Sequence, residues 1–208
     1  MYKKNSIAVI IPVYNEERNI SKVIGSIPKY VDEIIIVDDK STDNTLNILC
    51  ELKRDNPKIT IIQKEKNEGC GAAKRDGYLY AKTTNHSLFI TMDGDGQMDP
   101  NEIGNFINPI IEDRTDFVKA NRLFHQDILK EMPKYRYWGN AVLTLFTKIA
   151  SGYWHVTDAQ TGFTACNRKI IDSLPFEKLY TSYGYPNHLL VMLNIFNFRV
   201  SDISSKPI

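Results

Sequence analysis

The chain has 208 residues, 42% hydrophobic and 25% charged, which is the composition of a soluble globular protein large enough for one domain. Its 26 Lys and Arg nearly balance its 25 Asp and Glu, so the formal charge of +1 argues against a general nucleic-acid binder. No apolar run approaches the roughly 20 residues of a membrane span. The three cysteines lack metal-ligand spacing and indicate ordinary thiols in a reducing compartment.

The chain starts with MYKKNSIAVIIPVYNEE, a basic tip followed by an apolar run, as signal peptides do. The apolar run lasts only from Ile7 to Val13, acidic residues follow it, and it has no small-residue cleavage site. We interpret this segment as the first core strand and expect the protein to be cytoplasmic.

Apolar segments alternate with helical segments along the chain. Ile- and Val-rich strands separated by helices are typical of a mostly parallel sheet that is covered by helices on both faces. Since the sequence has no linkers or repeats, we expect one α/β domain over residues 1–208. The predicted strands are Ile7–Pro12, Glu33–Val37, Ile59–Gln63, Leu88–Met92, Phe117–Ala120 and Gly162–Cys166, and the predicted helices are Glu16–Ile27, Thr42–Asp55, Gly71–Lys82 and Pro100–Glu112.

A polar cluster follows each of the first five predicted strands. In chain order, these clusters are PVYNEE, DDKSTDNT, KEKNEGCGAAK, DGDGQMDP and NR. In open α/β sheets, ligands bind beyond the carboxyl ends of the strands, so the five clusters are expected to meet at one edge of the sheet. This concentration of polar residues predicts a binding site there.

The stretch DGDGQ carries three oxygen-bearing side chains, Asp93, Asp95 and Gln97, at alternate positions. An extended backbone would send all three toward one side, and such hard oxygen ligands suit Mg²⁺ or Mn²⁺. Gly94 and Gly96 would let a bulky ligand approach the backbone. A metal–phosphate site is therefore predicted here.

An EF-hand loop and a helix cap are the competing interpretations of DGDGQ. An EF-hand loop fails because Met98 stands where the turn glycine belongs and Gly104 where the bidentate Glu belongs. A polar turn whose acids cap the next helix is the simpler alternative, although Asp99-Pro100 already supplies such a cap.

VDDKSTDNT places two carboxylates at the end of the second predicted strand, just before a helix. Ser41 or Thr42 is a good N-cap for this helix, and Asp43 would complement its dipole. Capping leaves the pair Asp38 and Asp39 unexplained. A carboxylate at this position can accept the ring N–H of a uracil or guanine base.

The remaining polar clusters carry weaker signals. NEGCGAAKRDG lacks the third glycine of the dinucleotide fingerprint and is predicted to be a close-approach turn that opens a helix. Arg122 could balance phosphate charge or be a solvated surface residue. Asp158 and Gln160 stand just before the sixth predicted strand. The four histidines, His86, His125, His155 and His188, have no metal-ligand spacing.

Four motifs in order, PVYNEE, VDDKSTD, MDGDGQ and DAQTGF, resemble those of the family-two glycosyltransferases of GT-A fold, over essentially the whole chain. Within that family the likeness is closest to the polyprenyl-phosphate glycosyltransferases, including dolichyl-phosphate mannose synthases. The resemblance implies a Rossmann-like GT-A fold and an inverting, metal-dependent transfer. The donor would be a nucleoside-diphosphate sugar, with UDP or GDP favoured, and the acceptor a polyprenyl phosphate or a growing cell-envelope glycan.

The same resemblance assigns roles to individual residues. Asp158 would be the candidate base, with Gln160 beside it. A hydroxyl acceptor needs such a base, whereas a polyprenyl phosphate is already ionised and does not. The nucleotide-sugar-binding residues would be Pro12, Tyr14, Glu16, Asp38, Asp39, Asn67, Asp93 and Arg122, and the ligands of Mg²⁺ or Mn²⁺ would be Asp93, Asp95 and Gln97.

The sequence departs from the family pattern at three places. Lys40 replaces the usual glycine after the paired acids. His188 stands where relatives of this type commonly carry an acid, so a base role would fall to Asp158 or His188. The chain ends at SSKPI, where similar proteins continue, often into membrane-attachment segments, and a catalytic domain shortened at its C-terminus is one interpretation of that ending.

KEMPKYRYWGNAVLTLFTKIASGYW is an amphipathic stretch in which basic residues flank aromatic and aliphatic ones. It suits a helix at a membrane surface or a helix packed on the core. We hypothesise that it faces a lipid-linked acceptor at the cytoplasmic face of the membrane. The basic residues are Lys130, Lys134, Arg136 and Lys148.

Two further functional classes share some of these sequence features. FITMDGDGQ also resembles the first motif of the aspartate-nucleophile phosphatases, but those need a Thr or Val where Gln97 stands and usually carry the motif on the leading strand. A non-catalytic module that binds a nucleotide sugar is the second alternative, suggested by His188.

Overall fold

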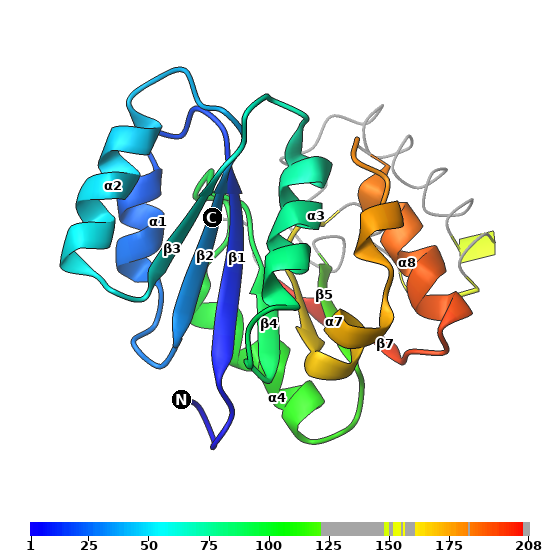
Figure 1. Ribbon diagram of the computed structural model, residues 1–208. Helices are drawn as coiled ribbons and strands as arrows, with labels where there is room; N and C mark the ends of the chain where they lie inside the picture. The colour runs from blue at the N-terminus through cyan, green and yellow to red at the C-terminus, as the bar shows by residue number, and fades with distance from the viewer. Residues whose placement is uncertain (122–147, 150–151, 155, 157–160, 183, 206–208) are drawn as a thin grey trace, which may run out of the picture.

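A computed structural model describes residues 1–121, 148–149, 152–154, 156, 161–182 and 184–205 (Figure 1). The strands in this part of the chain form one sheet in the order β3-β2-β1-β4-β6-β5-β7. Only β6 runs antiparallel to its neighbours β4 and β5, and all other described pairs are parallel. The predicted mostly parallel sheet is therefore confirmed.

The predicted elements all have counterparts, but α1 begins four residues later than expected, and β7, α7, α8 and η2 were not predicted. The strands are β1 Ile7–Val13, β2 Glu33–Asp38, β3 Ile59–Gln63, β4 Leu88–Thr91, β5 Phe117–Asn121, β6 Thr164–Asn167 and β7 Val200–Ser204. The helices are α1 Ile20–Ser26, α2 Thr45–Asp55, α3 Cys70–Ala81, α4 Ile103–Ile111, α7 Arg168–Ser173 and α8 Tyr185–Ile195, with 3-10 helices η1 Pro100–Glu102 and η2 Phe176–Lys178.

The sheet is buried on both faces, as its continuous apolar strands predict. Successive side chains of β1 alternate between two core clusters because strand side chains point to opposite faces. Val9 and Ile11 join a cluster with α1, α2 and α4, whereas Ala8 and Ile10 join one with α3, α7 and α8. Figure 1 shows the helices flanking the strands and β7 at the edge opposite β3. Helices on both faces are thus confirmed.

The loops after β1 and β2 are joined by hydrogen bonds. The backbone N–H of Asn15, which has a left-handed φ of 56°, donates to Ser41 Oγ at 3.0 Å, and the N–H of Thr42 donates to Asn15 Oδ1 at 2.8 Å. The predicted N-cap at Ser41 or Thr42 is therefore wrong: α2 begins at Thr45, whose N–H donates to Asp43 Oδ1. Ser41 and Thr42 instead form hydrogen bonds with Asn15 in the loop after β1.

None of the helices within the described residues is both long and apolar enough to cross a membrane.

The contact between α3 and β1 is tight enough to test by substitution. A methyl group on Gly77 would collide with Cγ2 of Ile10 and reach Cγ2 of Val37 at 3.4 Å. Gly77→Ala is therefore expected to lower the free energy of unfolding by about 1–3 kcal/mol, measured by urea denaturation.

Gly25 in α1 provides the matched control, since a methyl group added there would have no heavy atom within 4 Å among the described residues. Gly25→Ala should raise the free energy of unfolding by up to about 1 kcal/mol, because alanine loses less backbone entropy in a helix. Equal effects of the two substitutions would contradict the close packing of α3 on β1.

Candidate active site

Two clefts meet at Asp93, beyond the carboxyl end of β4. The first has a volume of about 280 Å³ and opens beside the ends of β1 and β2; the second, about 260 Å³, lies between the start of α3 and the start of α8. Asp93 and Cys70 line both clefts. The first cleft brings together six of the predicted site residues: Pro12, Tyr14, Glu16, Asp39, Asp93 and Asp95.

The DGDGQ segment is a turn, so the expectation of an extended backbone is wrong. β4 ends at Thr91, and Gly96 adopts a left-handed φ of 79°, which only glycine reaches without strain. The N–H of Gln97 donates to Asp95 Oδ1 at 3.0 Å, which closes the turn and leaves Gln97 exposed. Asp99 accepts from Asn101 N–H and caps η1, as predicted.

Asp93 forms an ion pair with a lysine that belongs to none of the predicted site residues. Lys74 Nζ lies 2.6 Å from Asp93 Oδ1 and donates to the hydroxyl of Tyr185 at 2.6 Å. The Lys74 side chain is only 1% exposed. Burial alone would disfavour the ammonium form, but Tyr185 and Asp93 raise the pKa of Lys74 well above its usual value. The buried ammonium group of Lys74 therefore compensates the negative charge of the Asp93 carboxylate.

The backbone at Gly162 packs directly on this ion pair. A methyl group at Gly162 would collide with Asp93 Oδ2 and lie 2.8 Å from Lys74 Nζ. Any larger residue would push the carboxylate away from the lysine. This contact explains why the TGF motif contains glycine. β6 begins at Thr164, two residues later than predicted.

The paired acids at the end of β2 have different surroundings. Asp39 accepts hydrogen bonds from the backbone N–H groups of Glu68 and Gly69, at 3.0 and 2.7 Å, so it fixes the turn before α3. Asp38 is fully buried and accepts from Ser41 N–H through Oδ1, whereas its Oδ2 has no hydrogen-bond partner among the described residues. A buried carboxylate oxygen without a partner is costly.

The turn before α3 is held by charge as well. Lys64 Nζ lies 2.8 Å from Glu68, 2.6 Å from Asp76 and 4.0 Å from Asp39. Although burial works against the charged form, hydrogen bonds from Lys64 to Asp76 and Glu68 raise the pKa of the lysine.

The start of α3 lies close to another segment of the backbone. A methyl group at Gly71 would lie 2.6 Å from the carbonyl oxygen of Thr181. The predicted close-approach turn is thus confirmed.

The other predicted site residues lie apart from the clefts or outside the described residues. Asn67 is exposed in the loop after β3, and His188 Nδ1 accepts the N–H of Tyr180 at 2.9 Å. Within the described residues, neither side chain lines either cleft. Asp158, Gln160 and Arg122 lie outside the described residues, as do Lys130, Lys134 and Arg136. The predicted roles of all these residues stay predictions.

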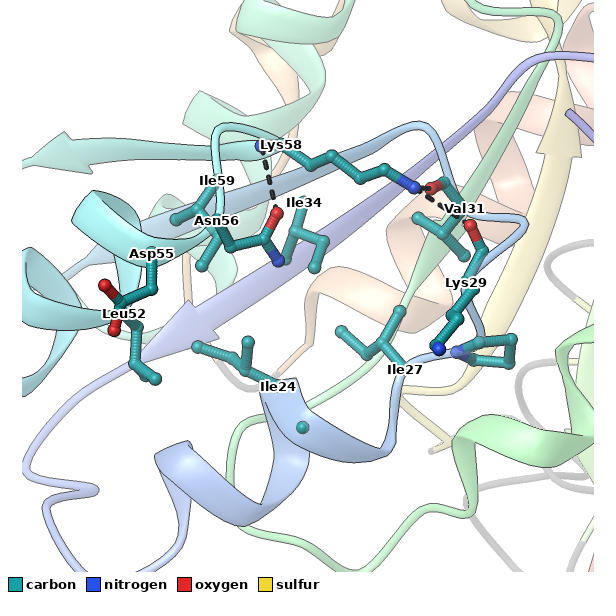
Figure 2. A pocket seen from close by; sticks show the side chains of 12 residues that line it. Ile24, Ile27, Lys29, Val31, Ile34, Leu52, Asp55, Asn56, Lys58 and Ile59 are labelled. Atoms are coloured by element: carbon teal, nitrogen blue, oxygen red, sulfur yellow. Dashed lines mark hydrogen bonds between the residues drawn. The ribbon is translucent and has the colours of Figure 1, made fainter.

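A larger cavity of about 470 Å³ lies at the opposite end of the sheet (Figure 2). Its walls are mainly apolar and come from the ends of α1 and α2 and the starts of β2 and β3. Lys58 Nζ donates to the carbonyl oxygens of Lys29 and Val31 there. Among the described residues, the carboxylate cluster lies at the other edge, so we do not assign the active site to this cavity.

Lys74 and Tyr185 were missed because each is a common residue in an ordinary helix. A signal for Lys74 was nevertheless present: it precedes Tyr78 by four residues, and Tyr78 belongs to the core face of α3. A lysine on the buried face of a helix requires a partner. The sequence alone does not say that this partner is Asp93.

Comparisons with known proteins agree with this geometry. The model of the family "Glycosyl transferase family 2" matches residues 8–174. The UDP-N-acetylglucosamine--dolichyl-phosphate N-acetylglucosaminyltransferase of Methanococcus voltae is 32% identical over 215 residues, covering 97% of this chain and 85% of that protein. The polyprenol monophosphomannose synthase of Mycolicibacterium smegmatis is 24% identical, over 85% of this chain and 67% of that protein.

Solved structures agree on the fold. The glucosyl-3-phosphoglycerate synthase of Mycobacterium tuberculosis, in a crystal structure with Mn²⁺, UDP and phosphoglyceric acid, matches with a TM-score of 0.69 and 20% identity, over 97% of this chain and 69% of that chain. The structural likeness supports the GT-A fold, and the family match replaces the phosphatase interpretation of DGDGQ. The chain is therefore a glycosyltransferase that belongs to glycosyl transferase family 2.

Proposed function

We propose that the protein transfers a sugar, with inversion, from a nucleoside-diphosphate sugar to a polyprenyl phosphate. The observation that carries this proposal is the junction of the two clefts at Asp93, since a transferase must bring a donor and an acceptor to one point. UDP-sugars are the first donors to test because the Methanococcus voltae relative is named for UDP-N-acetylglucosamine. The first cleft would take the nucleoside diphosphate and the second the transferred sugar and the acceptor phosphate.

The residues of the DGDGQ turn fit a divalent cation, Mg²⁺ or Mn²⁺. Asp93 and Asp95 line the first cleft and offer hard oxygen ligands, and the exposed Gln97 at the end of the turn would supply a third. No group of three His, Cys, Asp or Glu gathers as a metal site within the described residues, so the diphosphate itself would complete the coordination. When bound, the cation would act as a Lewis acid toward the leaving nucleoside diphosphate.

The first cleft also offers contacts to the nucleoside. The ring of Tyr14 is 46% exposed at the end of β1, where a base could stack on it. A ring N–H would find a carboxylate acceptor in the pair Asp38 and Asp39: Asp39 lines the first cleft, whereas Asp38 is fully buried and its Oδ2 has no hydrogen-bond partner among the described residues. Glu16 is held by Asn19 Nδ2, which donates to Glu16 Oε2 at 3.0 Å.

A polyprenyl phosphate attacks as an anion and needs no general base. A growing cell-envelope glycan is the alternative acceptor, and its hydroxyl would need Asp158 or His188 as a general base. In this proposal Gln160 would assist the base, and Arg122 would balance phosphate charge. The names of the relatives, which contain dolichyl phosphate and polyprenol, favour the phosphate.

A direct test is transfer of labelled N-acetylglucosamine from its UDP donor to dolichyl phosphate, with GDP-mannose in parallel. The wild type is expected to form a lipid-linked product with one donor, only when Mn²⁺ or Mg²⁺ is present. Asp95→Asn should lower the transfer rate roughly 100-fold, because it removes a carboxylate from the cation site. UDP together with Mn²⁺ should raise the melting temperature of the wild type but not that of Asp95→Asn.

Asp99→Asn is the matched control, since Asp99 lies two residues after DGDGQ but caps η1. It should retain transfer. Nucleotide binding without turnover would favour the non-catalytic module, and Mg²⁺-dependent hydrolysis of a simple phosphate ester without transfer would favour a phosphatase.

Cys70 offers a chemical probe of both clefts, because it lines the two of them and is exposed. Although the residue is exposed at the surface, partial burial of its thiol raises the pKa of Cys70 above the ordinary value of a cysteine. Since only the thiolate reacts, alkylation by iodoacetamide should still accelerate with pH above 9. In a Cys50→Ser background, alkylation should abolish UDP binding, as followed by mass spectrometry and thermal shift.

Cys70→Ser with Cys50 retained is the control, because Cys50 is the other exposed cysteine and lies on α2. Alkylation of this variant should leave UDP binding intact. An alkylation rate at Cys70 that levels off below pH 8.5 would contradict the raised pKa.

We further propose that the protein docks on the cytoplasmic face of a membrane to reach its lipid acceptor. Four large apolar side chains are exposed near the C-terminal end of α8: Ile149, Trp154, Ile195 and Phe196, at 62%, 64%, 67% and 42%. The segment around Gly152 and the C-terminal end of α8 are adjacent, because a methyl group on Gly152 would lie 3.1 Å from Asn194 Nδ2. Lys148 stands beside them. Exposed aromatic and aliphatic residues beside a basic one suit a bilayer interface.

Co-sedimentation with vesicles that contain phosphatidylglycerol tests this docking surface. The double variant Trp154→Ser/Phe196→Ser is expected to bind vesicles roughly tenfold more weakly, because it removes two large apolar groups from the interface. Tyr14→Ser, which removes an exposed aromatic ring at the donor cleft, should leave vesicle binding unchanged. Equal binding by all three proteins would contradict the docking surface.

A further inference from the structure

We propose that Lys74 is a positioning residue that orients Asp93 and makes cation binding at the DGDGQ turn depend on the nucleotide. This inference rests on the proposed function and adds a named residue to it. Lys74 is buried at the junction of the two clefts, where it forms an ion pair with Asp93 at 2.6 Å. Its side chain is only 1% exposed and is bonded to Asp93, so its effect on the cation would pass through the carboxylate.

The geometry around Asp93 leaves its carboxylate little freedom. Oδ1 is held by the ammonium group of Lys74 and lies 3.9 Å from the Cys70 thiol. The backbone at Gly162 packs against Oδ2. Lys74 is fixed in turn by the hydroxyl of Tyr185 and lies 4.9 Å from the centre of its ring. An ion pair anchored at both ends holds the carboxylate in one orientation before any ligand arrives.

The charge of Lys74 also affects any cation that approaches the turn. Asp93 and Asp95 are two residues apart in the chain and line the same cleft, so without compensation they would attract a divalent cation on their own. The ammonium of Lys74 cancels one of these charges inside a site where water screens it poorly. The phosphates of the nucleotide would then be needed to supply the missing negative charge.

A purely structural role for Lys74 makes a different prediction. If the side chain only filled space between α3 and α8, an apolar residue of similar length would change stability without changing the charge balance of the turn. Cation affinity in the absence of nucleotide separates the two cases, because packing alone does not alter it.

The experiment is a titration of the protein with Mn²⁺ alone, followed by electron paramagnetic resonance of the free ion. Lys74→Met is expected to bind Mn²⁺ roughly tenfold more tightly than the wild type, because Asp93 loses its compensating charge. Lys74→Arg keeps the charge and should bind Mn²⁺ like the wild type. Lys119→Met is the matched control: Lys119 is 2% exposed in β5 and lies 3.9 Å from Asp202, so its loss should leave Mn²⁺ affinity unchanged.

Unchanged Mn²⁺ affinity in folded Lys74→Met would overturn the inference. A measurement on the wild type covers the case in which this variant does not fold. The ¹⁵Nζ resonance of Lys74 should be visible and protected from exchange, because the ammonium is buried and hydrogen-bonded. Adding Mg²⁺ with UDP should shift this resonance; a resonance that does not move on saturation would contradict coupling between Lys74 and the ligand.

The outcome is distinguishable from a failure of the proposed function. Mn²⁺ titration without nucleotide does not depend on which sugar or acceptor the protein uses. Sugar transfer by the wild type with unchanged Mn²⁺ affinity in Lys74→Met would reject the role of Lys74 alone. Tighter Mn²⁺ binding in that variant with no transfer from any donor would reject the proposed function alone.

Discussion

The ion pair between Lys74 and Asp93 connects the segments that line the two clefts. Lys74 comes from α3, Asp93 from the turn after β4, and Tyr185 from the start of α8, while Gly162 packs on the pair just before β6. These segments are far apart in the sequence, and the pair brings them together at the point where the two clefts meet. Breaking a buried pair by removing one partner leaves an uncompensated charge, so each segment constrains the position of the others.

The acids at the edge of the sheet differ in how fully their carboxylate oxygens are hydrogen-bonded. Asp39 uses both carboxylate oxygens to accept from backbone N–H groups of the turn before α3, and Asp43 supports the start of α2. Asp38 and Asp95 each accept a backbone N–H through Oδ1, from Ser41 and Gln97 respectively. The Oδ2 of Asp38 has no hydrogen-bond partner among the described residues. A carboxylate whose oxygens are bonded to backbone N–H groups stabilises its turn, whereas a less fully bonded one keeps acceptor capacity.

The two faces of the sheet serve different purposes in this arrangement. The face with α1, α2 and α4 packs apolar side chains against Val9 and Ile11, so it supports this part of the sheet through apolar packing. The face with α3 and α8 carries Lys74, Tyr78 and Tyr185 among its buried side chains. Polar groups buried on that face are retained because each finds a partner, which is the condition for keeping them in a core.

The sequence by itself determined the alternation of strands and helices and the order of polar clusters, because local periodicity and turn residues act over short distances. It also indicated that DGDGQ belongs to a binding site and that the chain resembles the family-two glycosyltransferases. Only the tertiary structure decided that Gln97 closes a turn, that Asp39 binds backbone amides, and that Lys74 pairs with Asp93. β7 was likewise invisible, because VSDIS is too mixed in character to predict a strand and forms one through pairing with β5. Contacts between distant segments depend on how the sheet is assembled, and one sequence carries no direct record of them.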